Sequence, residues 1–247
     1  MKAWKVMKRG AAAVLVAVGL CGCAHVPDNA GQHPEDPWES MNRQTFLFNS
    51  AVDEYAIRPV AKGYQAVVPT FVQDRVGAFF TNMTEPRNIL NNALQGKGHD
   101  TMVSLYRFLV NTTLGLGGLF DVADHWAGQK VRAEDFGQTL RVWGVPTGPY
   151  VVLPILGPST ISDATGTVVG WYTEPLAYVD DDLVQWGSAG LYLLDQRVRV
   201  MPATDLLRDA VDPYVMAREG FLANRRNAAF DGNPPVEFVQ DEFEDQK

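Results

Sequence analysis

The residue with the most specific chemistry in this sequence is Cys23, which follows an apolar run and a glycine near the start of the chain. The first nine residues carry four basic side chains, and residues 10–20 are uncharged. A basic start, an apolar stretch and then small residues are typical of a secretory signal. Because Leu20 lies three residues before Cys23 and Gly22 directly before it, we expect cleavage after Gly22 and attachment of lipid to the Cys23 thiol.

Two alternatives to this lipidation site are a plain secretory signal with a chance cysteine and acylation of Cys21. Acylation of Cys21 would place Leu20 at the position where the peptidase needs a small residue. Ala24 follows Cys23, whereas the usual signal for retention in the inner membrane is an aspartate at that position. We therefore expect a lipid-anchored protein on the periplasmic side of the outer membrane. Its remaining chain has no free thiol for a disulfide or a cysteine metal site.

The residue types that commonly carry out catalysis do not form a recognisable motif. Ser188 lies in the sequence WGSAG, which lacks the first glycine of the nucleophile elbow of lipid hydrolases. His99 is better explained as a loop residue before a helix. Asp121, Asp124 and His125 fit a helix cap and solvated side chains better than a metal site. We expect no catalytic residue, no metal and no cofactor, so a lipid hydrolase is the weakest functional hypothesis.

The charge of the chain limits what it can bind. The sequence has 21 Lys+Arg and 29 Asp+Glu, and residues 1–22 hold four of the basic residues and none of the acidic ones, so the mature charge is 17 − 29 = −12. This charge argues against nucleic acid as a partner and against electrostatic adsorption to an anionic surface. Contact with a membrane is therefore expected to be hydrophobic.

Hydrophobic spacing predicts one mainly α domain. After the signal (residues 1–22) we expect a flexible lipidated tether (residues 23–35), then the domain (residues 36–230) and an acidic, disordered tail (residues 231–247). The first helix is expected to start with Asp36 as its cap and Pro37 in its first turn, and to run to about residue 55.

Further helices are expected along the rest of the domain. Two of them cover residues 72–83 and 88–94. A third is capped by Asp100 and has a wide apolar arc that is buried or faces lipid. A short helix is capped by Asp121, and a last helix restarts at Asp212 and Pro213. Residues 150–153 are the best candidate for a strand.

The most unusual segment lies between residues 142 and 173, where Asp163 is the single charged residue. Repeated prolines and glycines prevent a spanning helix. The segment is therefore either an ordinary buried core or a surface that lies in the membrane without crossing it. The expected lipid anchor favours the second interpretation, in which the candidate membrane-facing residues are Trp143, Tyr150, Leu153, Ile155, Leu156, Val168, Val169 and Trp171.

Several motifs together resemble the MlaA (VacJ) family of outer-membrane lipoproteins. The first motif contains Asp36, Pro37, Asn42 and Arg43. The others are residues 85–86, 107–112, 114–123, 136–140, 148–150, 153–154, 212–214 and 218–219. The likeness covers nearly the whole mature domain, so it is more specific than any single motif.

The resemblance implies a ring-like domain of amphipathic helices that lies in the membrane plane around an amphipathic channel. It also implies a function without catalysis: removal of mislocalised phospholipids from the outer leaflet and their delivery to a soluble periplasmic carrier, in association with a trimeric porin. The loop with Gly144, Pro146 and Gly148 matches the loop thought to adjust the channel, although Pro146 stiffens it and a plain turn is the alternative. The alternative function is a structural lipoprotein that scaffolds porins or other envelope partners.

Overall fold

The computed structural model describes residues 27 and 29–235. The expected signal, Cys23 and residues 236–247 of the expected tail lie outside the described residues. The helices are α2 (Glu39–Val52), η1 (Asp53–Ile57), α3 (Arg58–Val67), α4 (Thr70–Leu94), α5 (Gly98–Thr113), α6 (Val122–Ala127), α7 (Phe136–Val142), α8 (Ile161–Gly170), η2 (Trp171–Thr173), η3 (Pro175–Tyr178), α9 (Asp182–Arg208) and α10 (Pro213–Ala229). The strands are β1 (Tyr150–Leu153) and β2 (Gly157–Thr160), which form an antiparallel hairpin.

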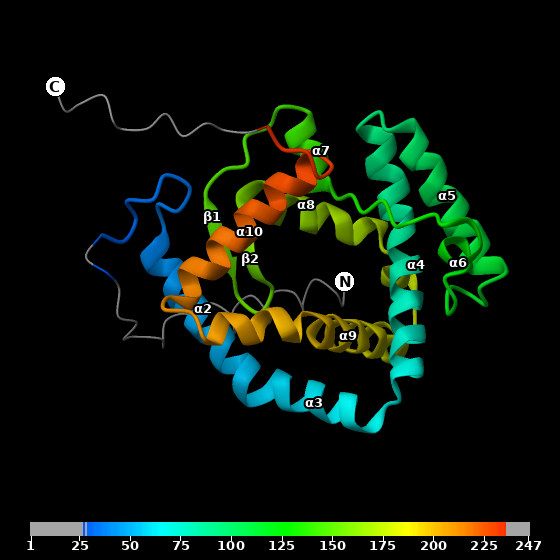
Figure 1. The fold of residues 1–247 in the computed structure, drawn as a ribbon, viewed down its shortest axis with the longest axis horizontal. Helices are drawn as coiled ribbons and strands as arrows, with labels where there is room; N and C mark the ends of the chain where they lie inside the picture. The colour runs from blue at the N-terminus through cyan, green and yellow to red at the C-terminus, as the bar shows by residue number, and fades with distance from the viewer. Residues whose placement is uncertain (1–26, 28, 236–247) are drawn as a thin grey trace.

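The long helices form a ring around a central opening (Figure 1). Helix α9 contacts α4 at one end and α10 at the other, α10 contacts α7, and α7 contacts α4, which completes the circuit. Helix α8 packs against α7, and the hairpin connects these elements to α2, since β1 contacts α2 and β2 contacts both α8 and α10. Helices α5 and α6 pack on the side of α4 that faces away from the opening (Figure 1). The mainly α, single-domain prediction is confirmed.

The start of the first helix differs from the sequence prediction. Helix α2 begins at Glu39 with Trp38 as the capping residue, and no side chain caps its first turn. Asp36 is fully buried instead, because its carboxylate binds distant side chains described below. The helical path continues from α2 through the π-helical turn η1 into α3, so the first helical segment extends to Val67.

Other local predictions have mixed outcomes. The two helices expected around residues 72–94 are one helix, α4, with Pro86 inside it. Asp100 lies in the first turn of α5 but does not cap it. The caps at Asp121 and Asp212 are confirmed: the Asp121 carboxylate accepts from the Asp124 N–H, and that of Asp212 accepts from the N–H groups of residues 214 and 215.

The strand expected at residues 150–153 is confirmed, and it forms one side of a small hydrophobic core. Tyr150, Val152, Tyr214 and Leu222 are buried together where β1, α2 and α10 meet. The ring of Tyr214 makes edge contacts with the rings of Tyr150 and Phe46, at centroid distances of 6.3 Å and 5.7 Å. Aromatic edge packing of this kind gives the junction a fixed geometry.

Two expected boundaries of the domain are also changed. The last residues of the expected tether are attached to the domain, since the Tyr150 N–H donates to the Glu35 carbonyl at 2.7 Å and the Gly31 N–H donates to Glu39 at 3.2 Å. At the other end, Asp231 forms an ion pair with Lys97. The ordered domain therefore begins before Asp36 and continues past residue 230.

Candidate functional site

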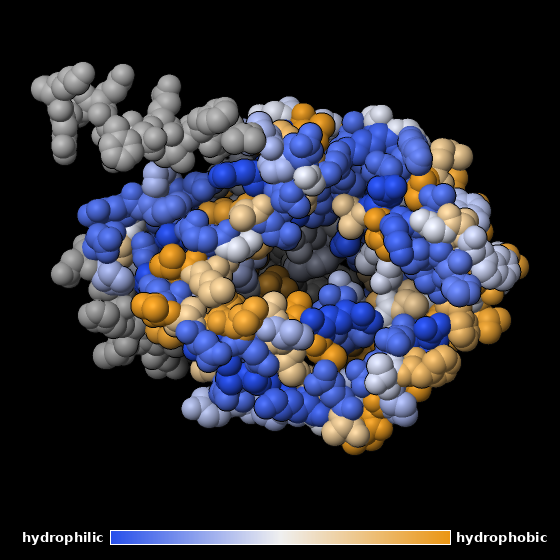
Figure 2. Space-filling view, in the orientation of Figure 1, coloured by the Kyte–Doolittle hydropathy of each residue, from blue (hydrophilic) through white to orange (hydrophobic). Residues whose placement is uncertain are grey.

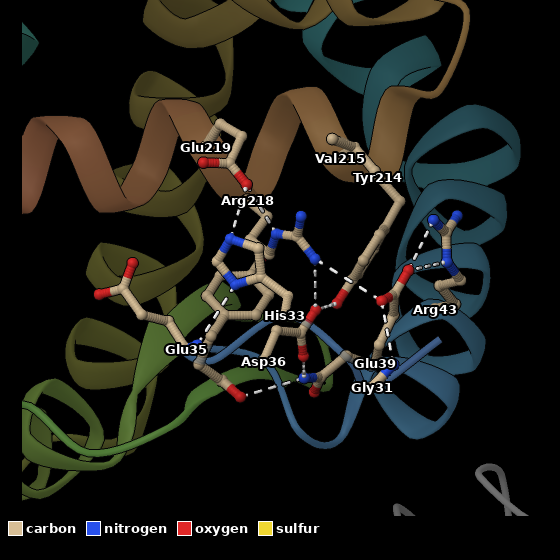
Figure 3. Close-up of polar contacts among 12 residues, drawn as sticks. Gly31, His33, Glu35, Asp36, Glu39, Arg43, Tyr214, Val215, Arg218 and Glu219 are labelled. Carbon is tan, nitrogen blue, oxygen red and sulfur yellow. Dashed lines mark hydrogen bonds and ion pairs between the residues drawn. The ribbon is translucent and has the colours of Figure 1, made fainter. Parts of the chain in front are cut away.

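The motif residues near the start of the domain form a buried polar cluster with residues near its end (Figure 3). Asp36 is fully buried, and one of its oxygens accepts from the Tyr214 hydroxyl at 2.5 Å and from Arg218 at 3.0 Å. Its other oxygen accepts from the Asn42 side-chain amide at 2.8 Å. We call Asp36, Asn42, Tyr214 and Arg218 the ring-closing cluster, because it joins α10 to α2 and the segment before it, and the path from α2 through α3 leads to α4 and so closes the ring on its α3 side (Figure 1).

The charge balance within the ring-closing cluster is set by its burial. Burial raises the pKa of the Tyr214 phenol, and the adjacent Asp36 carboxylate adds to this effect. Burial opposes the charge of Arg218, but its hydrogen bonds with Asp36 and Glu219 outweigh this and raise its pKa. Tyr214 therefore remains a neutral donor and Arg218 a cation. A buried carboxylate with three donors is satisfied in this way, whereas an unpaired one would be costly.

Arg43 continues the polar contacts of the cluster on the side of Asp212. Its guanidinium contacts both carboxylate oxygens of Asp212, at 3.2 Å and 2.8 Å, and also donates to Glu39 at 2.8 Å. It also lies 4.5 Å from the centroid of the Tyr214 ring. Burial opposes the charge of Arg43, but these two acceptors outweigh it and raise its pKa. Arg43 therefore holds the cap of α10 against α2. A cavity of about 340 Å³ adjoins these residues.

Asn42 also connects α2 to the hairpin. Its side-chain amide donates to the Tyr150 carbonyl at 3.0 Å and accepts from the Val152 N–H at 2.9 Å. Asn49, two turns further along α2, repeats this arrangement: it donates to the Leu153 carbonyl at 2.9 Å and accepts from the Ile155 N–H at 2.7 Å. Asn42 thus satisfies backbone groups of β1, and Asn49 does the same at the end of β1 and in the turn that follows it, where these groups would otherwise be unpaired.

Two further polar clusters join helices elsewhere in the molecule. Arg107 of α5 is fully buried; it donates to Glu85 of α4 at 2.6 Å and to both carboxylate oxygens of Asp121, at 3.2 Å and 2.9 Å. Burial raises the pKa of Glu85 although Arg107 opposes this rise. On the opposite side, Arg225 of α10 binds Asp135 before α7 and Asp163 of α8. The Arg107 contacts therefore join the consecutive helices α4 and α5, whereas the Arg225 contacts join α10 to residues 62 and 90 positions away in the sequence.

The surface of the molecule is hollowed at its centre, and apolar and polar residues both border the hollow (Figure 2). Large apolar side chains are exposed on several elements, including Leu183 at 83% and Trp186 at 65% on α9. Many buried side chains, by contrast, are polar or charged. In proteins that fold in water, exposed apolar patches of this extent mark contact with lipid or with another protein. Within the described part of the chain, no helix is long and apolar enough to cross a membrane.

The predicted hinge loop lies between α7 and β1. Gly144 and Gly148 have positive φ angles of 85° and 70°, which favour glycine at these two turns. Thr147 between them is fixed, since its hydroxyl accepts from Arg141 and its carbonyl accepts from the Ser162 N–H at 3.1 Å. The loop therefore has an exposed part around Pro146 and an attachment point at Thr147.

Seven of the eight candidate membrane-facing residues are at least partly accessible, and one is not. The prediction for Tyr150 is wrong: the side chain is fully buried in the core beside Tyr214. Leu153 is half-buried. The exposed residues are Trp143, Ile155, Leu156, Val168, Val169 and Trp171. The charge-poor segment therefore has both of the expected properties, with a core side at Tyr150 and an exposed apolar side.

The candidate catalytic residues do not assemble into an active site. Ser188 donates its hydroxyl to the Gln185 carbonyl within α9, while His99 and His125 belong to α5 and α6. Among residues 27 and 29–235, no group of three or more His, Cys, Asp or Glu could hold a metal ion. The cluster at Arg107 was not predicted from the sequence. A signal was present, because an arginine within a wide apolar helical arc requires a buried acceptor.

These features define a class of protein: a closed ring of helices with buried polar clusters, a central hollow and large apolar side chains exposed on several helices. The sequence profile of the MlaA lipoprotein family matches residues 34–228. The chain belongs to this family.

Similar proteins have names that describe lipid transport. A protein of Escherichia coli K12 is 35% identical over 92% of this chain and 93% of its own, and one of Haemophilus influenzae is 32% identical over 89% and 90%. Both are named "Intermembrane phospholipid transport system lipoprotein MlaA". A protein of Rickettsia conorii, described as uncharacterized, is 40% identical over 74% of this chain and 73% of its own.

A solved structure also resembles this chain. It has a TM-score of 0.70 and 34% sequence identity, and the match covers 80% of this chain and 99% of the other. The work that reported it is called "Structural basis for maintenance of bacterial outer membrane lipid asymmetry".

Proposed function

We propose that this protein transports phospholipids between membranes, by removing mislocalised phospholipids from the outer leaflet of the outer membrane and passing them through its central opening. The observation that carries this proposal is the closed ring with a central hollow (Figures 1 and 2), together with the large apolar side chains that are exposed on several of its helices. Such a ring can lie in a membrane without a spanning helix, and its exposed apolar side chains replace contacts between lipid tails. The related proteins named for phospholipid transport support the same proposal.

The ring is suited to this task because it is held by internal polar contacts. A phospholipid has a charged headgroup that cannot cross an apolar interior without polar partners. A hollow bordered by both kinds of residue can accommodate the headgroup and the tails together. The clusters around Asp36 and Arg225 join elements of the ring through polar contacts, and the Arg107 cluster holds α5 against the outer side of α4. No step of this process breaks or forms a covalent bond, so the proposed function is not enzymatic.

The proposed location follows from Cys23. Lipid on this residue would attach the protein to the periplasmic side of the outer membrane. We expect Cys23→Ser to abolish labelling with a fatty-acid analogue, while Cys21→Ser should leave the labelled mature protein unchanged. Labelling of the Cys23→Ser protein would contradict this assignment.

The proposed partners are the phospholipid itself, a trimeric outer-membrane porin and a soluble periplasmic lipid carrier. The exposed apolar residues of α9 and the charge-poor segment provide area for lipid or a porin. Within this proposal the loop with Gly144, Pro146 and Gly148 adjusts the opening, because its exposed part lies next to a fixed point at Thr147. Gly148→Ala tests this role: a Cβ there would lie 3.1 Å from the Ile161 side chain in a backbone region that disfavours alanine. We expect altered lipid leakage with retained folding.

The experiment that tests the transport function is deletion of the gene, with phospholipid in the outer leaflet measured by a surface-accessible acyltransferase that modifies lipid A. We expect more acyltransferase product in the deletion strain, and a return to the starting level when the wild-type gene is restored. An unchanged level, with porin assembly impaired instead, would contradict transport and favour a scaffolding lipoprotein.

A further inference from the structure

We propose that the protein has a second lipid-binding site, outside the ring, which holds the phosphate of a phospholipid headgroup on Arg75. The site is a cavity of about 510 Å³ lined by Arg75, Leu114, Leu116, Phe120, Asp121, Val122, His125 and Trp126. These residues come from α4, from α6 and from the loop between α5 and α6, on the side of α4 away from the central opening (Figure 1). The proposal goes beyond transport through the ring, which does not need this site.

Arg75 is unusual among the arginines of the described residues because it has neither a hydrogen-bond acceptor nor an ion-pair partner there. Its Nε atom is buried and makes no hydrogen bond. Its guanidinium is held by two aromatic rings, at 4.7 Å from the centroid of Phe120 and 5.1 Å from that of Phe71. Aromatic faces orient a guanidinium but leave its N–H donors available, and guanidinium donors match the geometry of phosphate oxygens.

The acidic residues near the cavity do not neutralise Arg75. Asp121 lines the cavity, but its oxygens accept from Arg107 and from Asn111, and these contacts lower its pKa although burial opposes them. Asp124 binds Lys130 at 2.8 Å. In a chain with a net charge of −8, one cation without a carboxylate partner is therefore available for an external anion.

The rest of the cavity determines which anion fits. Leu114, Leu116 and Trp126 line it and are exposed, so they offer apolar surface beside the guanidinium. Its volume is within the range of about 300–1,000 Å³ that is usual for small-molecule sites. A free phosphate would contact Arg75 but would leave this apolar surface in water. A phospholipid fits both the guanidinium and the apolar surface, because its phosphate is esterified to a glycerol that carries the acyl chains.

Photolabelling in a membrane tests the site. The full acylated protein would be reconstituted in vesicles of phosphatidylethanolamine and phosphatidylglycerol that contain a trace of phosphatidylglycerol with a diazirine near the start of one acyl chain. Mass spectrometry would give the ratio of adducts on residues 114–126 to adducts on residues 183–193 of α9, which measures lipid contact in general. This labelling requires no transport, so it can succeed or fail independently of the proposed function.

We expect Arg75→Gln to lower this ratio about tenfold, the effect of losing one charge-assisted interaction. Lys62→Gln removes the same charge from an exposed position on α3 and should leave the ratio unchanged. Trp126→Ala removes an exposed wall of the cavity and should also lower the ratio. This variant keeps Arg75, so it tests the site even if Arg75→Gln fails to fold.

Two further conditions separate a phospholipid from other ligands. A diacylglycerol with the same diazirine, which lacks the phosphate, should label residues 114–126 weakly and equally in wild type and Arg75→Gln. Inorganic phosphate in excess should not displace the labelled phospholipid. The proposal is overturned if Arg75→Gln labels like wild type, if Lys62→Gln causes the same loss, or if inorganic phosphate alone abolishes labelling.

Discussion

Substitution of Asn42 by alanine provides the sharpest test of how the ring is closed. The Asn42 side chain binds Asp36, the Tyr150 carbonyl and the Val152 N–H, at 2.8 Å, 3.0 Å and 2.9 Å. All of these partners belong to buried residues. Alanine would remove the three contacts at once and leave the Tyr150 carbonyl and the Val152 N–H without this partner.

The expected loss of stability follows from the two backbone groups of β1. A buried donor or acceptor without a partner costs about 1–3 kcal/mol, so the two groups put the loss in the free energy of unfolding at about 2–6 kcal/mol. For a domain of this size each kcal/mol lowers the Tm by about 2–4 °C, so Asn42→Ala should lower it by at least about 4 °C.

The assay is thermal unfolding of the purified protein in detergent, followed by near-ultraviolet circular dichroism. Ser50→Ala is the matched control, because Ser50 is an exposed residue on the same helix whose hydroxyl donates to the Phe46 carbonyl. We expect this control to change the Tm by less than about 2 °C. If Asn42→Ala unfolds at the same temperature as Ser50→Ala, the ring-closing cluster does not stabilise the fold as described.

Three other predictions follow from particular contacts. A Cβ on Gly166 would lie 2.5 Å from a backbone nitrogen of α7, so Gly166→Ala should lower the free energy of unfolding by about 1–3 kcal/mol. As a control, a Cβ on Gly190 of α9 meets nothing within 4 Å, so Gly190→Ala should raise it by about 0.5–1 kcal/mol. A higher Tm for Gly166→Ala than for Gly190→Ala would contradict the packing of α7 on α8. Burial opposes ionisation of Asp135, but the contacts with Arg225 outweigh burial and lower the pKa of Asp135. The stability from this ion pair is therefore present above about pH 4 and lost as the pH falls through the lowered pKa. Asp135→Asn should make the Tm depend less on pH in this acid range, and an unchanged pH dependence would contradict a stabilising role of the pair. Leu156 is exposed at the hairpin turn, so Leu156→Glu should reduce the quenching of tryptophan fluorescence by brominated lipids without lowering the Tm. Quenching equal to that of the wild-type protein would show that the turn does not enter the membrane.

Local structure could be predicted where short-range chemistry decides it. The cap at Asp212 followed by Pro213 fixes the start of α10, and the apolar run at residues 150–153 forms β1, because both signals lie within a few residues. The partner strand β2 has the sequence GPST, which has no apolar alternation, and it pairs because β1 lies beside it. Two separate helices were predicted at residues 72–83 and 88–94, yet α4 continues through Pro86 between them while packing against α5, α7 and α9.

The site was less predictable because its contacts join distant parts of the chain. Asp36 has the sequence context of a helix cap, but Tyr214 and Arg218 recruit its carboxylate from 178 and 182 residues away. Tyr150 was assigned to the membrane-facing surface from the lack of charge around it, and burial against Tyr214 shows that a charge-poor segment can also supply core residues. The resemblance identified both motif segments of the cluster, but not that they meet.

The most direct test of transport through the ring is a two-leaflet assay with the purified, acylated protein. Vesicles would carry a fluorescent phospholipid in both leaflets, and the protein would be inserted from the outside. Dithionite added outside the vesicles reduces the fluorophores of the outer leaflet, and it reduces those of the inner leaflet only after the lipid has moved outward. We predict that the folded protein makes the fluorescent lipid of the inner leaflet accessible to dithionite. Two controls should stay negative: Asn42→Ala protein that has been unfolded by heat should not expose the inner-leaflet lipid, and a water-soluble fluorophore trapped inside the vesicles should remain protected. Continued protection of the inner-leaflet lipid with folded protein present would contradict the proposed passage through the central opening.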